Sequence, residues 1–277
     1  HGWFAQMDDA GIVIFLFLYD DSVDPFGAHD EAEQAFIDDL VGEMRGYDHL
    51  IWVVAEEYSE SIPASRARQI AARIRATDPV HPIANHQLTG TVFDHAGDAT
   101  FDAFAAQLDN GTDPAIDPNG THRAVVAAWR NAAGRYVVIG AELQPDHGYP
   151  GRETLTRQTT WGAVLGGAYV TVLRWWDDVR PDGNPSPGTT EQRQAGYVRQ
   201  FVSRTRFDVM EPADDRAAGD TEWVLAHRRD LGNDYFIGYG RSVTGGIGFT
   251  GLDAGTYNLT WLDNQTGDTL TGQQSVP

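Results

Sequence analysis

The sequence predicts an α/β fold in which residues 1–206 form a barrel of parallel strands and residues 207–277 form a small antiparallel β-sandwich. Up to about residue 206, short runs rich in Val and Ile alternate with amphipathic helical stretches. These runs show no polar alternation, which is typical of strands buried on both faces of a parallel sheet. From Phe207 onward the pattern changes to short strands separated by turn sequences.

Six segments have the composition of buried strands: Ile12–Tyr19, Leu50–Ala55, Ile83–His86, Phe101–Gln107, Tyr136–Ala141 and Ala168–Arg174. Five segments place apolar residues at helical spacing: Asp30–Arg45, Pro63–Thr77, Thr121–Ala133, Arg152–Leu165 and Thr190–Arg206. This order implies right-handed crossovers within a doubly wound sheet or a barrel. The sequence has neither Gly-x-Gly-x-x-Gly after its first strand nor a Walker loop, which favours the barrel. A closed barrel of this class has eight strands, and only six are visible.

Four strands are expected in the C-terminal part: Trp223–Arg228, Asp234–Arg241, Gly245–Gly251 and Gly255–Asn264. Leu252–Gly255 and Asp263–Gly267 are turn sequences of the hairpin type, with Gly available for a positive φ. The polar segment Glu211–Asp220 is expected to connect the two domains.

The composition excludes several classes of partner. Net charge is −20, and all 20 basic residues are Arg, against 40 Asp and Glu. Such a surface repels nucleic acid and anionic membranes. This acidic composition suggests a halophilic origin, because strongly hydrated carboxylates keep a protein soluble in high salt. The alternative is a GC-rich genome, which also replaces Lys by Arg. Without Cys there is no disulfide, thiolate metal site or cysteine nucleophile.

The sequence contains only weak signals of where the protein is located. The longest apolar stretch, Gly11–Tyr19, is far shorter than the roughly 20 residues of a membrane-spanning helix. No signal peptide is visible, and the chain begins within what looks like a helix. Four Asn-x-Thr sequons fit an extracellular, secreted protein, although a Thr-rich chain produces them by chance: Asn110, Asn119, Asn258 and Asn264.

Two apolar runs, about 85 residues apart, end in carboxylates. Leu50–Ala55 is followed by Glu56 and Glu57, and Tyr136–Ala141 is followed by Glu142. The carboxyl ends of parallel strands are where α/β barrels hold their catalytic residues. Two acids there predict carboxylate-pair catalysis.

The stretch from Trp52 to Glu56-Glu57 resembles the fourth-strand motif Trp-x-x-x-Asn-Glu of clan-A glycoside hydrolases, with Glu56 in place of Asn. This variant is similar to the apiosidase-like family, in which Gly-Glu-Glu is frequent at this point. Gly140-Ala141-Glu142 resembles the Gly-x-Glu that ends the seventh strand of that family. The resemblance implies a (β/α)8-type TIM barrel, Glu57 as general acid/base and Glu142 as nucleophile. It also implies retaining hydrolysis of a plant or algal polysaccharide or oligosaccharide, without a cofactor.

Other segments extend the resemblance: His81-Pro82, His86, Phe101-Asp102, Gln107, Trp161 and Gly166-Gly167 in the barrel, and Asp234–Phe236, Gly255–Tyr257 and Trp261–Asp263 in the tail. The tail looks like the small β domain, labelled collagen-binding, that follows this barrel in the family. On this template Ile12–Tyr19 is the third strand and the β domain stops before its last strand. The chain is therefore expected to be a fragment.

Glycoside cleavage needs one carboxyl that donates a proton and one, ionised, that attacks the anomeric carbon. We expect burial against Trp52 and Tyr58, and the charges of Glu56 and Glu142, to raise the pKa of Glu57. In a retaining enzyme the two carboxyl groups lie about 5–5.5 Å apart, and in an inverting enzyme about 6.5–9.5 Å.

Glu56 is expected to orient the substrate rather than react. Aromatic side chains that could stack on sugar rings are Tyr19, Tyr149, Trp175 and Trp176. Polar side chains that could bind sugar hydroxyls are Asp20, Asp21, His86, Gln107 and His147.

Other interpretations remain open. Glu57 and Glu142 could instead be paired with Arg152 or Arg174, Trp175-Trp176 could pack at a domain interface, and the chain could be a non-catalytic carbohydrate-binding or adhesion protein on a degenerate barrel. A metal-dependent hydrolase is disfavoured because the histidines match no zinc spacing: His81, His86, His95, His122 and His147.

The acidic loop with Asp177, Asp178, Asp182 and Asn184 could hold calcium or simply be solvated. The β domain could bind carbohydrate or protein, or support the barrel; the oligomeric state is not encoded in any pattern.

Overall fold

The computed structural model describes residues 2–108, 118–143, 153–170 and 190–277. The helices are α1 (Gly2–Asp9), α2 (Glu31–Met44), α3 (Ala64–Thr77), α4 (Pro118–Ala132), α5 (Glu153–Leu165) and α6 (Thr190–Val202). The strands of the N-terminal part are β1 (Ile14–Tyr19), β2 (Leu50–Ala55), β3 (Ile83–Gln87), β4 (Ala103–Gln107), β5 (Val137–Glu142) and β6 (Tyr169–Val170). The chain divides into two compact units: His1–Gln107 with Ala128–Ala141, and Leu108–Ala127 with Glu142–Pro277.

The six strands β1–β6 form one sheet in sequence order. Strands β1 to β4 are parallel to their neighbours, with Tyr19 opposite Ala55 at the carboxyl ends of β1 and β2. The N–H of Val137 donates to Asp102 and the N–H of Leu108 donates to Glu142, each at 2.8 Å, so β5 runs parallel to β4. The predicted α/β fold with a parallel sheet is confirmed, and β2 has the predicted bounds.

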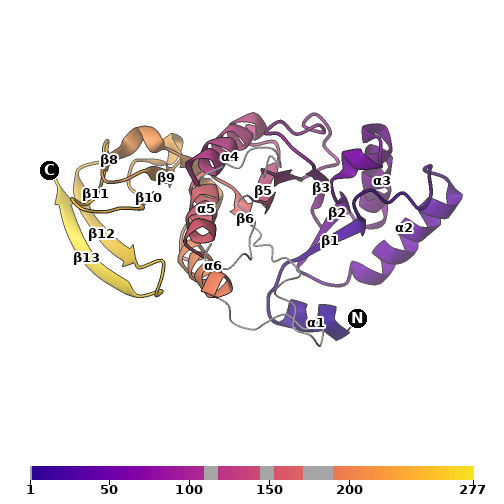
Figure 1. Ribbon diagram of the computed structural model, residues 1–277, viewed down its shortest axis with the longest axis horizontal. Helices are drawn as coiled ribbons and strands as arrows, with labels where there is room; N and C mark the ends of the chain where they lie inside the picture. The colour runs from indigo at the N-terminus through magenta and orange to yellow at the C-terminus, as the bar shows by residue number, and fades with distance from the viewer. Residues whose placement is uncertain (1, 109–117, 144–152, 171–189) are drawn as a thin grey trace. The chain divides into compact units, whose positions relative to one another are not determined.

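Both faces of the first unit's sheet are apolar, which explains the strand sequences. One face carries a cluster of mostly small side chains, including Val53, Ala84 and Ala105. The opposite face packs against α2 and α3, which lie together beside β1–β3 (Figure 1). Ile37 of α2 and Ile70 of α3 are fully buried there. This burial on two sides is the reason why the strands lack polar alternation.

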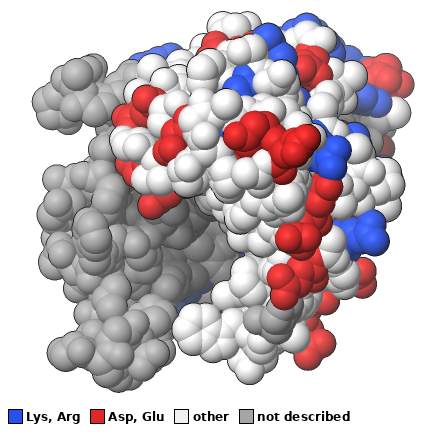
Figure 2. All heavy atoms as spheres, turned by 90° about the vertical axis from the view of Figure 1, so that its right-hand side faces the viewer, with Lys and Arg blue, Asp and Glu red and all other residues white. Residues whose placement is uncertain are grey.

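The outer side of α2 and α3 carries much of the charge of the first unit. Figure 2, which views the right-hand side of Figure 1, shows Asp and Glu side chains distributed over this face with Arg side chains among them. Helix α2 alone contributes four acids outside its buried positions: Glu31, Asp38, Asp39 and Glu43. On helix α3, the guanidinium of Arg73 forms an ion pair with Asp38. The halophilic interpretation of this acidity stays a prediction.

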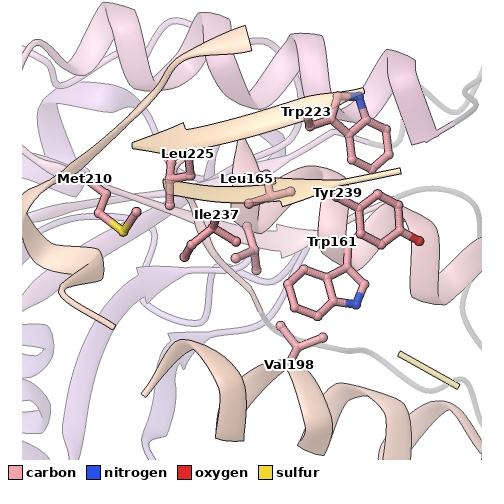
Figure 3. Close-up of a cluster of buried hydrophobic side chains, with 9 residues drawn as sticks. Trp161, Leu165, Val198, Met210, Trp223, Leu225, Ile237 and Tyr239 are labelled. Atoms are coloured by element: carbon pink, nitrogen blue, oxygen red, sulfur yellow. The ribbon is translucent and has the colours of Figure 1, made fainter. Parts of the chain in front are cut away.

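The second unit joins α5 and α6 to the C-terminal strands through a cluster of buried side chains (Figure 3). Trp161 of α5 stacks on Tyr239 at 5.7 Å between ring centroids, and Tyr239 stacks on Trp223 at 5.2 Å. The imidazole of His122 on α4 also stacks on Trp223, at 5.1 Å between ring centroids. Four stacked rings from four elements therefore hold this unit together. The expected boundary at residue 206 stays a prediction.

The C-terminal strands are antiparallel and form three small sheets, which fits a small β domain. Their bounds are β7 (Met210–Pro212), β8 (Ala217–Gly219), β9 (Trp223–His227), β10 (Phe236–Tyr239), β11 (Ile247–Phe249), β12 (Gly255–Leu262) and β13 (Thr269–Val276). Strands β7, β8 and β13 were not predicted from the sequence.

The segment predicted as a polar connection is part of the β structure instead. It contains the end of β7, a short 3-10 turn and β8. Its acids bind neighbouring groups: Asp214 accepts the N–H of Val224 at 2.9 Å, and Asp220 accepts the N–H groups of Thr244 and Gly246. The acidic side chains of this segment accept hydrogen bonds from backbone N–H groups of adjacent strands and turns. The polar composition of the segment has this structural cause and does not indicate an interdomain connection.

Candidate active site

The carboxyl ends of β1 and β2 place Asp20 and Glu56 side by side. Tyr19 and Ala55 are register partners, and the N–H of Glu56 donates to the carbonyl of Tyr19 at 3.0 Å, which extends the pairing by one residue. The chain then turns away at Asp20, whose Oδ1 accepts the N–H of Asp21 at 3.1 Å. Two parallel strands thus end in adjacent carboxyl groups.

Glu57 adopts an unusual backbone conformation directly after β2. Its φ of 39° and ψ of 45° lie in the left-handed region, which is uncommon for a residue with a side chain and costs free energy. The conformation begins the short 3-10 helix Tyr58–Glu60 and directs the Glu57 N–H to Nδ1 of His86 at 3.2 Å. Strained residues of this kind concentrate at functional sites.

His86 is held neutral in one tautomer. Because a backbone N–H can only donate, the bond from Glu57 shows that Nδ1 of His86 is an acceptor and that Nε2 carries the proton. The side chain is fully buried, and burial lowers its pKa to about 4. Within the described part of the chain, Nε2 has no hydrogen-bond partner. His86 is therefore a hydrogen-bond donor at Nε2 rather than a metal ligand, which would need a lone pair there.

Glu56 lies close to this imidazole. A carboxylate oxygen of Glu56 is within 4.8 Å of a ring nitrogen of His86. Burial, the hydrogen bond to Asp20, and the negative charges of Asp20, Asp21 and Glu57 raise the pKa of Glu56 to about 7. Glu56 thus keeps its proton to near-neutral pH. The raised pKa that was expected at Glu57 stays a prediction.

Two aromatic side chains of these strands do not act as predicted. Tyr19 is only 4% exposed and its hydroxyl donates to Glu33 of α2, so its ring is not a stacking face for sugar. Trp52 donates from Nε1 to Asp78, in the loop that precedes β3, so it lies toward the opposite end of the sheet from Glu57. The prediction that Trp52 shields Glu57 is therefore wrong.

Tyr58 is buried, and it anchors the 3-10 helix instead. Its hydroxyl donates to Asp94 at 2.6 Å and its ring contacts the imidazole of His95. His95 in turn bonds Asn85 of β3 at 3.0 Å. This partly buried network next to the 3-10 helix was not expected from the sequence, where Asn85, Asp94 and His95 have no recognisable spacing.

Gln107 and Glu142 end the next strands. Gln107 is the last residue of β4, is 5% exposed, and its Oε1 has no hydrogen-bond partner among the residues that the structure describes. Glu142 is the last residue of β5. Since β1 to β5 are parallel, the backbone at Glu142 and Gln107 reaches the same edge of the sheet as Glu57.

Four predicted substrate-binding residues, together with both proposed Arg partners, lie outside the described residues: His147, Tyr149, Trp175, Trp176, Arg152 and Arg174. The acidic loop from Asp177 to Asn184 also lies outside them. Within the described ranges, oxygens of Asp21, Glu57 and Glu60 lie within 4.8 Å of one another, an arrangement that is also common without a cation. Two other predicted histidines among the described residues form separate local contacts: His81 bonds Asp78 and His122 bonds Asp214.

No protein-family model and no curated protein matches this sequence. Several solved structures are similar in fold, and two of them are described here. One is described as "Glycoside hydrolase", with a TM-score of 0.60 and 16% identity over 87% of this chain. The other is a family 5 glycoside hydrolase from Bacteroides vulgatus, with a TM-score of 0.70 and 15% identity over 98% of this chain.

The chain spans 63% of the first structure and 68% of the second. At these identities the likeness shows the fold, and it agrees with a parallel sheet that forms part of a TIM barrel. No helix in the described ranges is long and apolar enough to cross a membrane.

Proposed function

We propose that this chain is the catalytic part of a clan-A glycoside hydrolase that cleaves a glycosidic bond in a polysaccharide or oligosaccharide with retention of configuration. Glu57 is the general acid/base and Glu142 is the nucleophile. The Glu56-Glu57 pair supports the apiosidase-like family, and the C-terminal strands support that family's β domain. Both assignments rest on the motifs and not on the fold.

One observation carries the proposal: acids follow β2, and an acid is the last residue of β5, at the same edge of one parallel sheet. Both similar structures bear glycoside hydrolase names, which supports carbohydrate chemistry at that edge. Barrel enzymes build their sites there because loops after several strands converge on one substrate.

The mechanism needs the two acids in opposite protonation states. Glu57 donates a proton to the leaving oxygen while ionised Glu142 attacks the anomeric carbon and forms a glycosyl-enzyme. Glu57, now ionised, then takes a proton from the water that releases the sugar. The Nε2–H of His86 and the amide of Gln107 would bind hydroxyls of the substrate. A net charge of −20 disfavours polyanionic glycans at low salt.

The test is turnover of a panel of neutral plant and algal glycans by wild type, Glu57→Gln and Glu142→Gln, with Glu31→Gln on the exposed start of α2 as the matched control. Each site variant should lose about 10²–10⁴-fold in rate while it still binds the sugar, and the control should keep its rate. NMR of the first product should show the anomer of the substrate. Sugar binding without turnover in every form would support a carbohydrate-binding protein instead.

A further inference from the structure

We propose that the C-terminal strands hold a binding site for a neutral carbohydrate chain, in the cavity between the hairpin β12–β13 and strands β10 and β11. The cavity lies within the second unit and contains none of the residues of the candidate active site. The proposal therefore goes beyond the proposed function, and it can be tested by binding without turnover.

The cavity has the size of a ligand site. Its volume is about 600 Å³, within the range of about 300–1,000 Å³ that is typical of such sites. One wall is a single face of the hairpin, on which Tyr257, Leu259 and Trp261 alternate along β12, with Gln274 of β13 opposite Tyr257. The other wall consists of side chains of β10, β11 and α6, and Figure 1 shows the hairpin beside these two strands.

The hairpin is held near both of its ends, so the cavity is preformed. Near the start of β12, the hydroxyl of Tyr257 lies within hydrogen-bond distance of the carbonyl oxygens of Asn233 and Asp253, at 3.0 and 2.9 Å. At the turn between the strands, Gly267 lies directly against Tyr197 of α6, since a Cβ added at Gly267 would come within 2.6 Å of the ring. A preformed site loses little conformational entropy when it takes up a ligand.

The charge of the walls favours a neutral ligand. Strands β12 and β13 contain no charged residue, although 22% of the residues of the chain are charged. Among the described residues that line the cavity, only Asp234 is charged, and it already bonds His227 at 3.1 Å. An anionic glycan or a phosphate ester would find no cation in this lining.

The remaining lining combines aromatic faces with hydrogen-bonding groups. Trp261 is 46% exposed and Tyr257 is partly exposed, so both rings can be reached from solvent. The C–H face of a sugar ring is apolar and packs on an aromatic ring, while the hydroxyl groups at its edge need polar partners. Gln274 offers an amide and Asp234 a carboxylate for these hydroxyl groups. A purely apolar ligand would leave both polar groups without such partners.

The test uses three neutral probes, the hexamers of β-1,4-linked glucose, xylose and mannose, with the full chain carrying Glu57→Gln to limit hydrolysis. At least one hexamer should slow amide hydrogen exchange in β12 and β13. Calorimetry should show that this site binds about tenfold more weakly, or worse, when Trp261→Ala or Gln274→Ala is added. Trp261→Phe keeps an aromatic face and should retain most of the affinity.

Two matched controls should bind as tightly as the parent. Trp3→Ala removes a tryptophan of α1 that is 79% exposed, and Gln273→Ala removes the neighbouring amide on the opposite face of β13, where it bonds Asn258. Far-UV circular dichroism checks that every variant is folded. Gln274 is exposed, so Gln274→Ala still decides the question if Trp261→Ala does not fold.

The proposal is overturned if no hexamer changes exchange in β12 and β13, or if Trp261→Ala and Gln274→Ala bind as tightly as their controls. Protection of these strands that grows with protein concentration and not with sugar would assign the face to a second copy of the chain. If wild type turns over no glycan but a hexamer protects β12 and β13, the proposed function fails and the binding site stands.

Discussion

Replacing Glu56 by Gln should change how the stability of the fold depends on pH. The pKa of Glu56 is about 7 in the folded chain, against an ordinary value of 4.5. The folded state therefore binds a proton that the unfolded state has released between these two pH values. Stability from this group is fully present below pH 4.5 and is lost as pH rises through 7.

The magnitude follows from that interval. At about 1.4 kcal/mol per pH unit, the span from 4.5 to 7 corresponds to about 3 kcal/mol. Glu56 is only partly buried, so solvent screening reduces this to about 2 kcal/mol. Gln has no charged form, and Glu56→Gln should be more stable relative to wild type at pH 8 than at pH 4.5 by that amount.

The assay is urea unfolding of wild type, Glu56→Gln and the control Glu31→Gln at pH 4.5, 6 and 8, at one fixed salt concentration. The control should change little over this range, because Glu31 is exposed at the start of α2. If the free energy of unfolding of Glu56→Gln differs from wild type by the same amount at pH 4.5 and 8, Glu56 does not titrate near 7 and the reasoning is refuted.

Three further predictions concern stability. Arg66→Ala should lower the free energy of unfolding in urea by about 3–5 kcal/mol, because it leaves the fully buried carboxylate of Glu33 without its cation. Arg73→Ala removes a partly exposed ion pair and should lower it by about 1 kcal/mol or less. Equal losses in the two variants would contradict this expectation. Trp223→Ala should lower the unfolding free energy by about 3–5 kcal/mol, and near-UV circular dichroism should report loss of the ring stack; an unchanged spectrum would count against it. If the acidic surface is a halophilic adaptation, removing NaCl should unfold the chain, and full far-UV signal without salt would favour the GC-rich genome instead.

The parallel sheet could be predicted because burial on both faces produces apolar runs without alternating polar residues. Val53 and Val54 are both fully buried, one toward each face, so β2 shows no alternation and its bounds were predictable. The C-terminal strands lack this signature. Strand β13 is rich in Thr and Gln and is almost entirely exposed, and β7 and β8 are three residues each. Their pairing depends on partners distant in sequence, which local composition does not encode.

The site was predictable only to the level of strand ends. Glu56 and Glu57 were located because they follow an apolar run, but their roles depend on contacts with other strands. The left-handed conformation of Glu57, and the tautomer that its N–H fixes in His86, arise from β2 and β3 lying side by side. The wrong expectation for Trp52 has the same origin, since the sequence does not show which end of a strand a long side chain reaches.

The chain treats two groups of neighbouring acids differently, and the contrast argues for function at the second. After β1, Arg66 forms ion pairs with both Asp24 and Glu33, and the hydroxyl of Tyr19 donates to Glu33. Among the residues that the structure describes, no guanidinium forms an ion pair with Asp20 or Glu56, although a negative charge on Glu56 costs stability above pH 7. An Arg beside Glu56 would hold that group ionised. The absence of a cation among the described neighbours is thus the condition under which Glu56 can carry a proton at neutral pH.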